Sequence, residues 1–294
     1  MSFETWAEHE VIAAAQGLNL RTPTRHQSMF KYIGLNTKKS WDYFGRMLKD
    51  LELFGSTAKS LNDPFELSPY IFDDLRPKVV AQALSDHGYS LNERLHNVPP
   101  YTLEEKYANL EPYRKAARSY LERTERYSRI ICFCERSDSP LLSSHYANSY
   151  KGACLHFLGR AFTKSRARVG YVNYASHRLT FPMSLALALN HERPKFSSHL
   201  KMEADKMYFF SKAQDWAYEN EMRIVYDVNQ MKSVKFEPDG LASIIIGPRM
   251  LDEDESRIRN MVANSMMPHI PITRARLSTN SYSVEIAQSD GRVP

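Results

Sequence analysis

The chain has 294 residues, of which 43% are hydrophobic and 25% are charged. This balance is typical of a folded protein with a sizeable core, and it excludes an intrinsically disordered chain. The formal net charge of +5 is too mild to indicate a nucleic-acid partner by itself.

The sequence also argues against a membrane-spanning or secreted protein. It contains no apolar run of about 20 residues, the length that a bilayer requires, and its acidic start lacks the apolar stretch of a signal peptide. Three cysteines are too few, and odd in number, for a disulfide scaffold. We therefore expect a cytoplasmic protein with reduced thiols.

In chain order, hydrophobic spacing predicts helices with one apolar face and short strands between them. The expected helices cover residues 4–16, 38–52, 72–96, 102–126, 141–150, 183–190 and 199–213. The expected strands cover residues 27–33, 129–134, 153–157, 169–174, 216–227, 232–236, 242–246 and 272–277.

The order of these elements indicates an α+β fold. The strands at 129–134, 153–157 and 169–174 lack the long helical crossovers of a doubly wound sheet, and no G-x-G-x-x-G or Walker A segment is present. We expect a mixed, largely antiparallel sheet with surrounding helices. An N-terminal helical extension over residues 1–28 would precede a single domain over residues 29–294.

The strongest chemical signal is a pair of carboxylates in the segment from 216 to 223. In a strand, Glu219 and Glu221 would project from one face, with α-carbons about 6.5–7 Å apart. Two carboxylates are costly to bury, so they must meet solvent, a cation or a ligand, and Arg223 on the same face could neutralise one of them. The alternating side chains would face the core: Trp216, Tyr218, Met222 and Ile224. The pattern fits either an exposed face with a Glu–Arg pair or a catalytic carboxylate with an assisting neighbour.

The segment Asn62–Glu66 is a turn by its chemistry, because Asn and Asp bond their own backbone and Pro fixes the next dihedral angle. Phe65 would anchor this turn to the core. The alternative is a loop at the mouth of a ligand site, where Asp63 or Glu66 could contact a ribose or a cation.

Two clusters have a structural and a chemical interpretation. Cys132, Cys134, Cys154 and His156 could meet on neighbouring strands, but their spacing is not that of zinc knuckles, so we expect buried thiols and no metal. The basic cluster at 160–168 is either a solvated surface or a phosphate-binding patch formed by Arg160, Lys164, Arg166 and Arg168.

Several short motifs follow one another in a recognisable order: Phe30–Tyr32, Asn62–Glu66, Ile131–Cys134, Ser144–Ala147, Gly152–Phe157 and Trp216–Arg223. This series resembles the bacterial domain-of-unknown-function family 2971. The block from Ile131 to Leu155 also resembles the nicotinamide pocket of transferases of the poly-ADP-ribose-polymerase type. The segment Asn220–Asp227 is similar to the strand that bears their catalytic glutamate.

The transferase resemblance implies an ADP-ribosyltransferase-like fold with NAD as the substrate. Glu221 matches the catalytic glutamate, which would bond the nicotinamide-ribose 2′-hydroxyl and stabilise the oxocarbenium-like transition state. Glu219 would orient the acceptor and Arg223 would support the charge, with Asp63 as a further candidate contact. Tyr146 matches the tyrosine that stacks on nicotinamide.

The remaining positions are a pair of serines and two departures from the transferase pattern. Ser143 or Ser144 would bond the nicotinamide amide, or cap the helix. Lys31 replaces the histidine of the first strand, unless Tyr32 holds the adenosine ribose, and Cys132 replaces an aromatic residue.

The leading prediction is therefore an NAD-dependent ADP-ribosyltransferase, or an NAD glycohydrolase, acting on a macromolecular acceptor. The alternatives are a catalytically inert nucleotide-binding module and a nucleic-acid-associated protein.

Overall fold

The computed structural model describes residues 16–84, 104–190 and 197–286. The chain forms two compact units. The first unit consists of Met1–Arg21, Thr57–Ser128 and Val172–Ala217, and the second consists of Thr22–Ser56, Arg129–Tyr171 and Tyr218–Pro294. The sequence predicts a single domain over residues 29–294, and the structure divides this range between the two units. That the two units form one domain stays a prediction.

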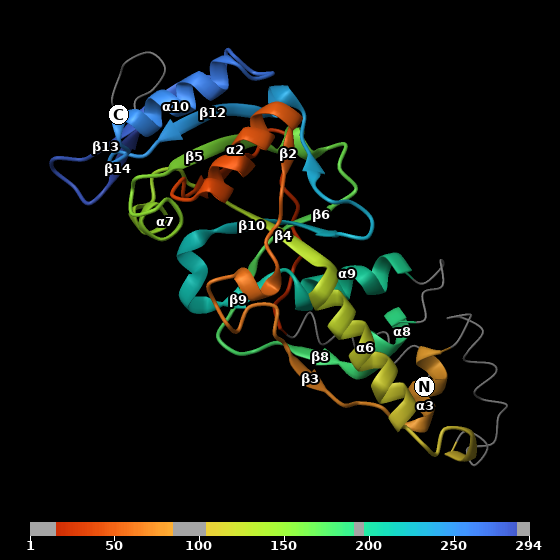
Figure 1. The fold of residues 1–294 in the computed structure, drawn as a ribbon. Helices are drawn as coiled ribbons and strands as arrows, with labels where there is room; N and C mark the ends of the chain where they lie inside the picture. Colours follow the sequence, from red (N-terminus) through yellow and green to blue (C-terminus); the bar gives the residue numbers. More distant parts are fainter. Residues whose placement is uncertain (1–15, 85–103, 191–196, 287–294) are drawn as a thin grey trace. The chain divides into compact units, whose positions relative to one another are not determined.

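An eight-stranded sheet forms the centre of the second unit (Figure 1). In spatial order its strands are β14 (Val284–Ile286), β13 (Ile272–Leu277), β12 (Leu241–Ile246), β5 (Ala153–Leu158), β1 (Ser28–Ile33), β4 (Ser128–Cys134), β10 (Glu221–Asp227) and β6 (Arg168–Tyr171). The pairs β1–β4, β1–β5, β5–β12, β6–β10 and β13–β14 are antiparallel, whereas β12 and β13 are parallel. The predicted α+β class and largely antiparallel sheet are confirmed. A separate ribbon pairs β2 (Glu52–Leu53) with β11 (Val234–Lys235).

One face of this sheet shares the main hydrophobic core with α2 (Lys38–Asp50) and α10 (Asp252–Ala263) (Figure 1). α2 begins at a capping box in which Thr37 and Ser40 bond each other's backbone amides. Its apolar face is buried as predicted: Trp41, Phe44, Met47 and Leu48. α10 is absent from the predicted elements, although its acidic first turn and the spacing of Ile258 and Val262 are helix signals.

The opposite face of the sheet carries a smaller cluster. Cys154 and Ile245 are buried in it, and Phe30 and Tyr32 pack against them. The short helix α7 (Pro140–Tyr146) packs against β1. The side chains of β1 therefore alternate between the main core and this second cluster.

Two glycines allow backbone segments to meet where α7 leads into β5. Residues 148–150 all have positive φ, at 47°, 53° and 70°, which ends the helix. A β-carbon at Gly152 would lie 2.1 Å from the carbonyl oxygen of Ile33, and one at Gly247 would lie 2.3 Å from that of Tyr150. The amide of Gly247 donates to the carbonyl oxygen of Gly152 at 2.9 Å. Because Gly152 and Gly247 lack side chains, the backbones at the end of β1, the start of β5 and the end of β12 can approach closely.

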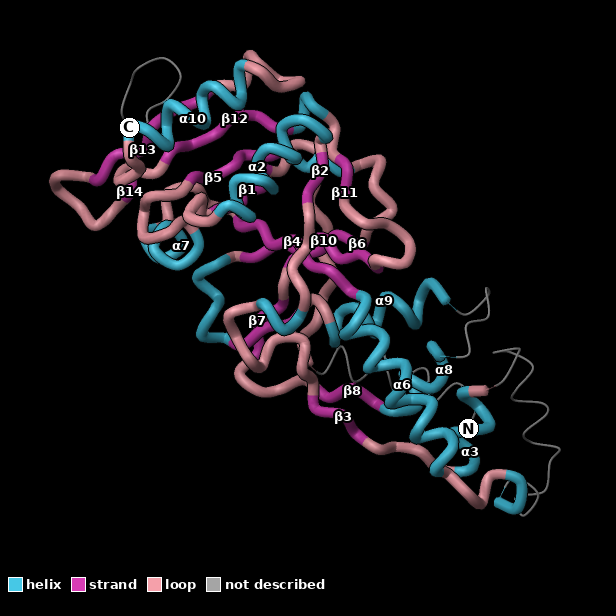
Figure 2. Tube along the Cα trace, viewed as in Figure 1, coloured by secondary structure: helices cyan, strands magenta, loops and turns pink. Residues whose placement is uncertain are grey.

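Helices and two short parallel strand pairs make up the described part of the first unit (Figure 2). The helices are α3 (Pro77–Ala83), α6 (Glu111–Tyr127), α8 (Met183–Asn190) and α9 (Ser197–Tyr208). The strand pairs are β3 (Tyr70–Phe72) with β8 (Thr180–Pro182) and β7 (Asn173–Ala175) with β9 (Ser211–Ala213). α8 is apolar on most sides and packs against α3, α6 and α9, so Leu185 and Leu187 are fully buried.

Several predicted boundaries differ from the structure. The strand expected at 169–174 is divided, because β6 ends in the second unit and β7 pairs within the first. The helix expected at 102–126 has its main part from Glu111, whose amide donates to the side chain of Asn109, and Pro112 favours a first turn there. The helix expected at 199–213 ends at Tyr208.

The helix expected at 4–16 and the second half of the one at 72–96 lie outside the described residues. Within the ranges that the structure does describe, no helix is long and apolar enough to cross a bilayer.

Candidate functional site

The carboxylate segment is not one continuous strand. Residues Gln214–Glu219 form a 3-10 helix, and β10 begins only at Glu221. Between them, Asn220 has a φ of 43°, a left-handed conformation that asparagine tolerates better than most residues. The prediction of a strand over 216–220 is therefore wrong, and Glu219 is positioned by a turn rather than by strand alternation.

Alternation holds within β10 itself. Met222 and Ile224 are fully buried in the main core, as predicted, so Glu221 and Arg223 face the other side of the sheet. Trp216 and Tyr218 lie in the 3-10 helix and are half-buried. The prediction that their side chains face the core is therefore wrong.

Glu221 and Arg223 form a buried ion pair. The Nε and Nη2 atoms of Arg223 donate to the two carboxylate oxygens of Glu221 at 2.8 and 2.9 Å. Arg223 is fully buried and Glu221 is 3% exposed, so their mutual attraction offsets part of the cost of burying each charge. The expected neutralisation by Arg223 is present, whereas the expected exposed sheet face is wrong.

Glu219 is held by a tyrosine from α7. The Tyr146 hydroxyl donates to Oε1 of Glu219 at 2.6 Å, and Glu219 is 4% exposed. A phenol that donates to a carboxylate makes a short, charge-assisted bond. Tyr146 is half-buried and therefore links two elements through its polar tip instead of lying in the core.

Lys31 extends from β1 toward the neighbouring strand β4. Its Nζ donates to the carbonyl oxygen of Cys132 at 3.4 Å and lies 5.8 Å from the centre of the Phe133 ring. Burial lowers the pKa of Lys31, and the nearby thiols and Glu221 oppose that change. The Lys31 side chain of β1 therefore interacts electrostatically with Glu221 of β10.

The thiol of Cys134 lies near both carboxylates. Burial raises its pKa to about 12, and the negative charges of Glu219 and Glu221 add to the increase, while Lys31 acts in the opposite direction. Elements far apart in the sequence therefore place their side chains in one region. We call this group the carboxylate cluster, and its members are Cys134, Tyr146, Glu219, Glu221 and Arg223. Lys31 lies on the other face of the sheet, the main-core face of Met29 and Phe133, and acts on the cluster only through its charge.

The start of α7 is fastened to Tyr32. The Tyr32 hydroxyl accepts a bond from the amide of Ser139 at 3.3 Å, and burial raises its pKa. The side chain of Ser139 caps the helix by accepting the amide of Leu142 at 3.3 Å, so the capping role considered for Ser143 and Ser144 belongs to Ser139. Ser143 is buried and donates to the Ser139 carbonyl at 2.8 Å, whereas Ser144 is exposed.

Asp63 belongs to the first unit, whereas the residues of the carboxylate cluster belong to the second. Its carboxylate accepts the amide of Phe65 at 2.8 Å, which is the turn geometry that the sequence predicts. Phe65 is 64% exposed, so its expected role as a core anchor is wrong, and Leu67 is buried in its place. Glu66 is buried and lies 3.7 Å from Nζ of Lys212.

The three cysteines are free thiols. Among the residues that the structure describes, no three or more His, Cys, Asp and Glu side chains are grouped so that they could hold a metal ion. His156 instead shares a hydrogen bond with Ser28 at 2.9 Å and stacks on Phe30 with ring centres 4.5 Å apart. Burial lowers the pKa of His156.

The basic cluster at 160–168 is partly neutralised. Arg160 lies 3.3 Å from Asp239, and Lys164 lies 3.1 Å from Glu237. These ion pairs reduce the positive potential that a phosphate backbone would meet.

The sequence singled out most of the carboxylate cluster but not the place of Cys134 in it, and it did not identify Ser139, which caps α7. A Ser-Pro pair before an apolar turn is a helix-start signal that could have identified Ser139. Chemically, the cluster offers two carboxylates, one held by an arginine and one by a phenol. Comparisons with protein families, curated proteins and solved structures found no match to the chain.

Proposed function

We propose that the chain is an NAD-dependent ADP-ribosyltransferase, or an NAD glycohydrolase, with an ADP-ribosyltransferase-like fold. The observation that carries the proposal is the 2.6 Å bond between Tyr146 and Glu219. The transferase resemblance assigns Tyr146 to the nicotinamide ring and the segment of Glu219 and Glu221 to the ribose. These two segments must meet for the reaction, and the bond joins them.

The reaction would break the bond between the ribose C1′ and the nicotinamide nitrogen. The bonding electron pair leaves with nicotinamide, and positive charge develops on the ribose. The carboxylate of Glu221 would stabilise that charge, and Arg223 would keep the carboxylate ionised and fixed in orientation. A nucleophile of the acceptor, or water, then forms the new bond to C1′ and releases its proton to solvent, with Glu219 orienting the nucleophile.

Residues around the cluster would hold the rest of NAD. Tyr32 and Cys132 lie on the sheet face of Glu221 and would line the donor site, with Tyr32 holding the adenosine ribose. Lys31, which stands where the transferase pattern has a histidine, would contribute only its positive charge from the other face of the sheet. Ser143 or Ser144 would bond the nicotinamide amide. The proposed acceptor is a macromolecule, because a transferase of this type modifies a partner rather than a small metabolite.

A specific observation also favours an inert module that binds NAD or another nucleotide. Both carboxylate oxygens of Glu221 already accept bonds from Arg223, and Glu221 is 3% exposed. A carboxylate engaged in this way must exchange or share these bonds before it can act on a ribose. This second candidate keeps the donor-binding residues but predicts no cleavage.

Release of nicotinamide from NAD by the purified chain tests both candidates. For the transferase, Glu219→Gln and Glu221→Gln should each lower the rate by about 100-fold or more, the loss typical when one electrostatic contact to a transition state is removed. Glu255→Gln removes a carboxylate from an ion pair on α10 and serves as the matched control.

The outcomes separate the candidates. Equal turnover by the wild-type chain and Glu221→Gln would reject the catalytic role. Saturable NAD binding without nicotinamide release supports the inert module, and absence of NAD binding rejects both. Thermal unfolding of each variant shows whether a loss of turnover reflects a loss of fold.

A further inference from the structure

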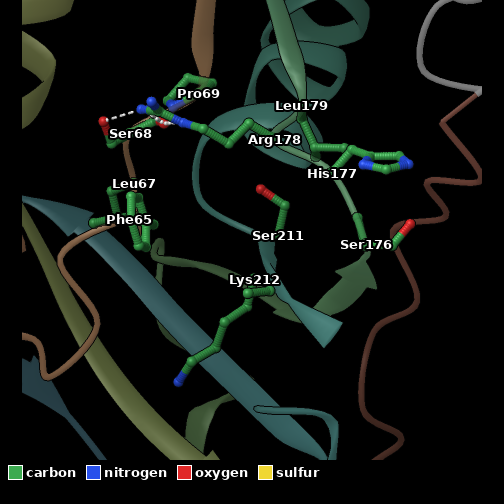
Figure 3. A pocket seen from close by; sticks show the side chains of 12 residues that line it. Phe65, Leu67, Ser68, Pro69, Ser176, His177, Arg178, Leu179, Ser211 and Lys212 are labelled. Carbon is green, nitrogen blue, oxygen red and sulfur yellow. Dashed lines mark hydrogen bonds between the residues drawn. The ribbon is translucent and has the colours of Figure 1, made fainter. Parts of the chain in front are cut away.

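A pocket of about 220 Å³ opens within the first unit (Figure 3). Its walls come from the turn that follows Asp63, from the connection between β7 and β8, and from β9. All of the lining residues belong to the first unit, so the pocket is independent of the carboxylate cluster.

The lining combines apolar walls with positive charge. Phe65, Leu67 and Leu179 provide much of the apolar surface, and the basic residues are His177, Arg178 and Lys212. No aspartate or glutamate is among the residues that line the pocket. A concave site with apolar walls and a few polar groups is typical of small-molecule binding.

Among the residues that the structure describes, Ser68, and no carboxylate, holds Arg178 in place at the pocket. Its Nε donates to the carbonyl oxygen of Ser68 at 3.0 Å, and its Nη2 donates to the Ser68 hydroxyl at 2.7 Å. Figure 3 shows the guanidinium beside Ser68. The guanidinium also lies 5.9 Å from the centre of the Phe65 ring. Arg178 is an exposed cation whose described contacts fix its plane and leave its charge uncompensated.

Lys212 has a different role. Its Nζ lies 3.7 Å from the buried carboxylate of Glu66 and 4.8 Å from the centre of the Trp216 ring. In Figure 3 its side chain extends away from Arg178. The charge of Lys212 is thus balanced by Glu66, and the net positive charge of the pocket comes from Arg178.

The pocket wall that contains Leu67 includes an unfavourable backbone conformation. Leu67 has a φ of 55°, in the left-handed region that is unfavourable for a residue with a β-carbon. Leu67 is buried, and the Asx turn at Asp63 precedes it. Strained residues of this kind are concentrated at ligand-binding sites.

We propose that this pocket binds a small organic anion, consisting of a phosphate or carboxylate carried on a single ring. The anionic group would pair with Arg178, and the ring would lie against Phe65, Leu67 and Leu179. The volume of about 220 Å³ is below the roughly 300–1,000 Å³ of sites for drug-sized ligands, which suits a ligand of one ring and its anionic group. The proposal does not depend on NAD chemistry.

Ligand-observed and protein-observed NMR titrations of the full chain test this site with defined probes. Phenyl phosphate and benzoate should bind at millimolar concentration or below, and the tighter of the two identifies the anionic group. Inorganic phosphate should bind at least tenfold more weakly than phenyl phosphate because it lacks the ring, and benzyl alcohol should not bind because it lacks the charge.

Two variants locate the site. Arg178→Gln should weaken phenyl phosphate at least tenfold, and Phe65→Ala should weaken phenyl phosphate without changing the affinity for inorganic phosphate. Arg46→Gln is the matched control, because Arg46 is an exposed arginine 4.1 Å from the ring centre of Phe54 but pairs with Glu52. Its affinity for phenyl phosphate should be that of the wild-type chain.

Three results of these titrations would overturn the proposal, and a competition experiment supplies a fourth. These are the absence of binding by both ring-bearing anions, equal affinity for phenyl phosphate and inorganic phosphate, and undiminished binding by Arg178→Gln. Competition between NAD and phenyl phosphate would also overturn it, because the site would then belong to the nucleotide. Failure of nicotinamide release leaves this prediction unchanged, so the two proposals fail separately.

Discussion

The buried pair of Glu221 and Arg223 makes a quantitative prediction about stability. Replacing Arg223 by methionine keeps an unbranched apolar stem but removes the guanidinium and its two bonds to the buried carboxylate of Glu221. Because Arg223 is fully buried and its two bonds measure 2.8 and 2.9 Å, this loss should cost about 3–5 kcal/mol of unfolding free energy.

A double-mutant cycle isolates the interaction. Glu221→Gln should cost a similar amount, since it removes the negative charge that accepts both bonds from the buried guanidinium of Arg223. The double variant should recover much of the loss, because neither charge is then buried alone, and the coupling energy should exceed about 1.5 kcal/mol. Urea unfolding followed by circular dichroism measures all four free energies without the ionic screening that guanidinium chloride introduces.

An exposed pair provides the control for this cycle. Arg259 and Glu255 lie 2.7 Å apart on α10, and the arginine side chain is 49% exposed. Removing Arg259 should therefore cost about 1 kcal/mol or less. If Arg223→Met is no more costly than Arg259→Met, the reasoning from burial is refuted.

Three further predictions follow from burial and close packing. The unfolding free energy should fall as the pH drops below about 6.5, because burial lowers the pKa of His156 and the unfolded chain then binds more protons than the folded one. Iodoacetamide at pH 8 should label the half-buried Cys132 before Cys134 and Cys154, whose thiol pKa values burial raises. Gly152→Ala should cost more than about 2 kcal/mol, because its β-carbon would lie 2.1 Å from a backbone oxygen.

Each of these predictions has a direct check. His156→Gln should remove part of the fall in stability with pH, and an unchanged pH profile would contradict the assignment. Mass spectrometry of labelled peptides gives the order of cysteine reactivity, and early labelling of Cys154 would contradict its burial. Gly45→Ala is the glycine control, because an alanine there meets only the flexible end of Met261, at 3.2 Å.

Local patterns predicted the centre of the fold well. The strands at β1, β4, β5, β12 and β13 and the buried face of α2 follow from apolar runs and helical spacing, both of which depend on neighbouring residues alone. The division at Val172 was not predictable in this way. Tyr171 and Asn173 pair with different strands, and those partners are set by tertiary contacts.

The candidate site shows the same limit. Sequence reasoning identified Glu219, Glu221, Arg223 and Tyr146, but it placed both carboxylates on one strand. Asn220 breaks that alternation, because a single left-handed residue converts a strand pattern into a turn. The bond from Tyr146 to Glu219 joins residues far apart in the chain, and no local pattern encodes such a contact.

The glycine contacts at the end of α7 have a consequence for the order of folding. Gly152 and Gly247 are distant in the sequence, and their backbones meet only after β12 has paired with β5. Contacts of this separation form late, because a long loop must first close. We therefore expect the segment from Tyr146 to Gly152 to reach its final conformation only after β12 has joined the sheet. A ribosome-bound chain that ends before β12 would carry the β1–β5 pairing without an assembled carboxylate cluster.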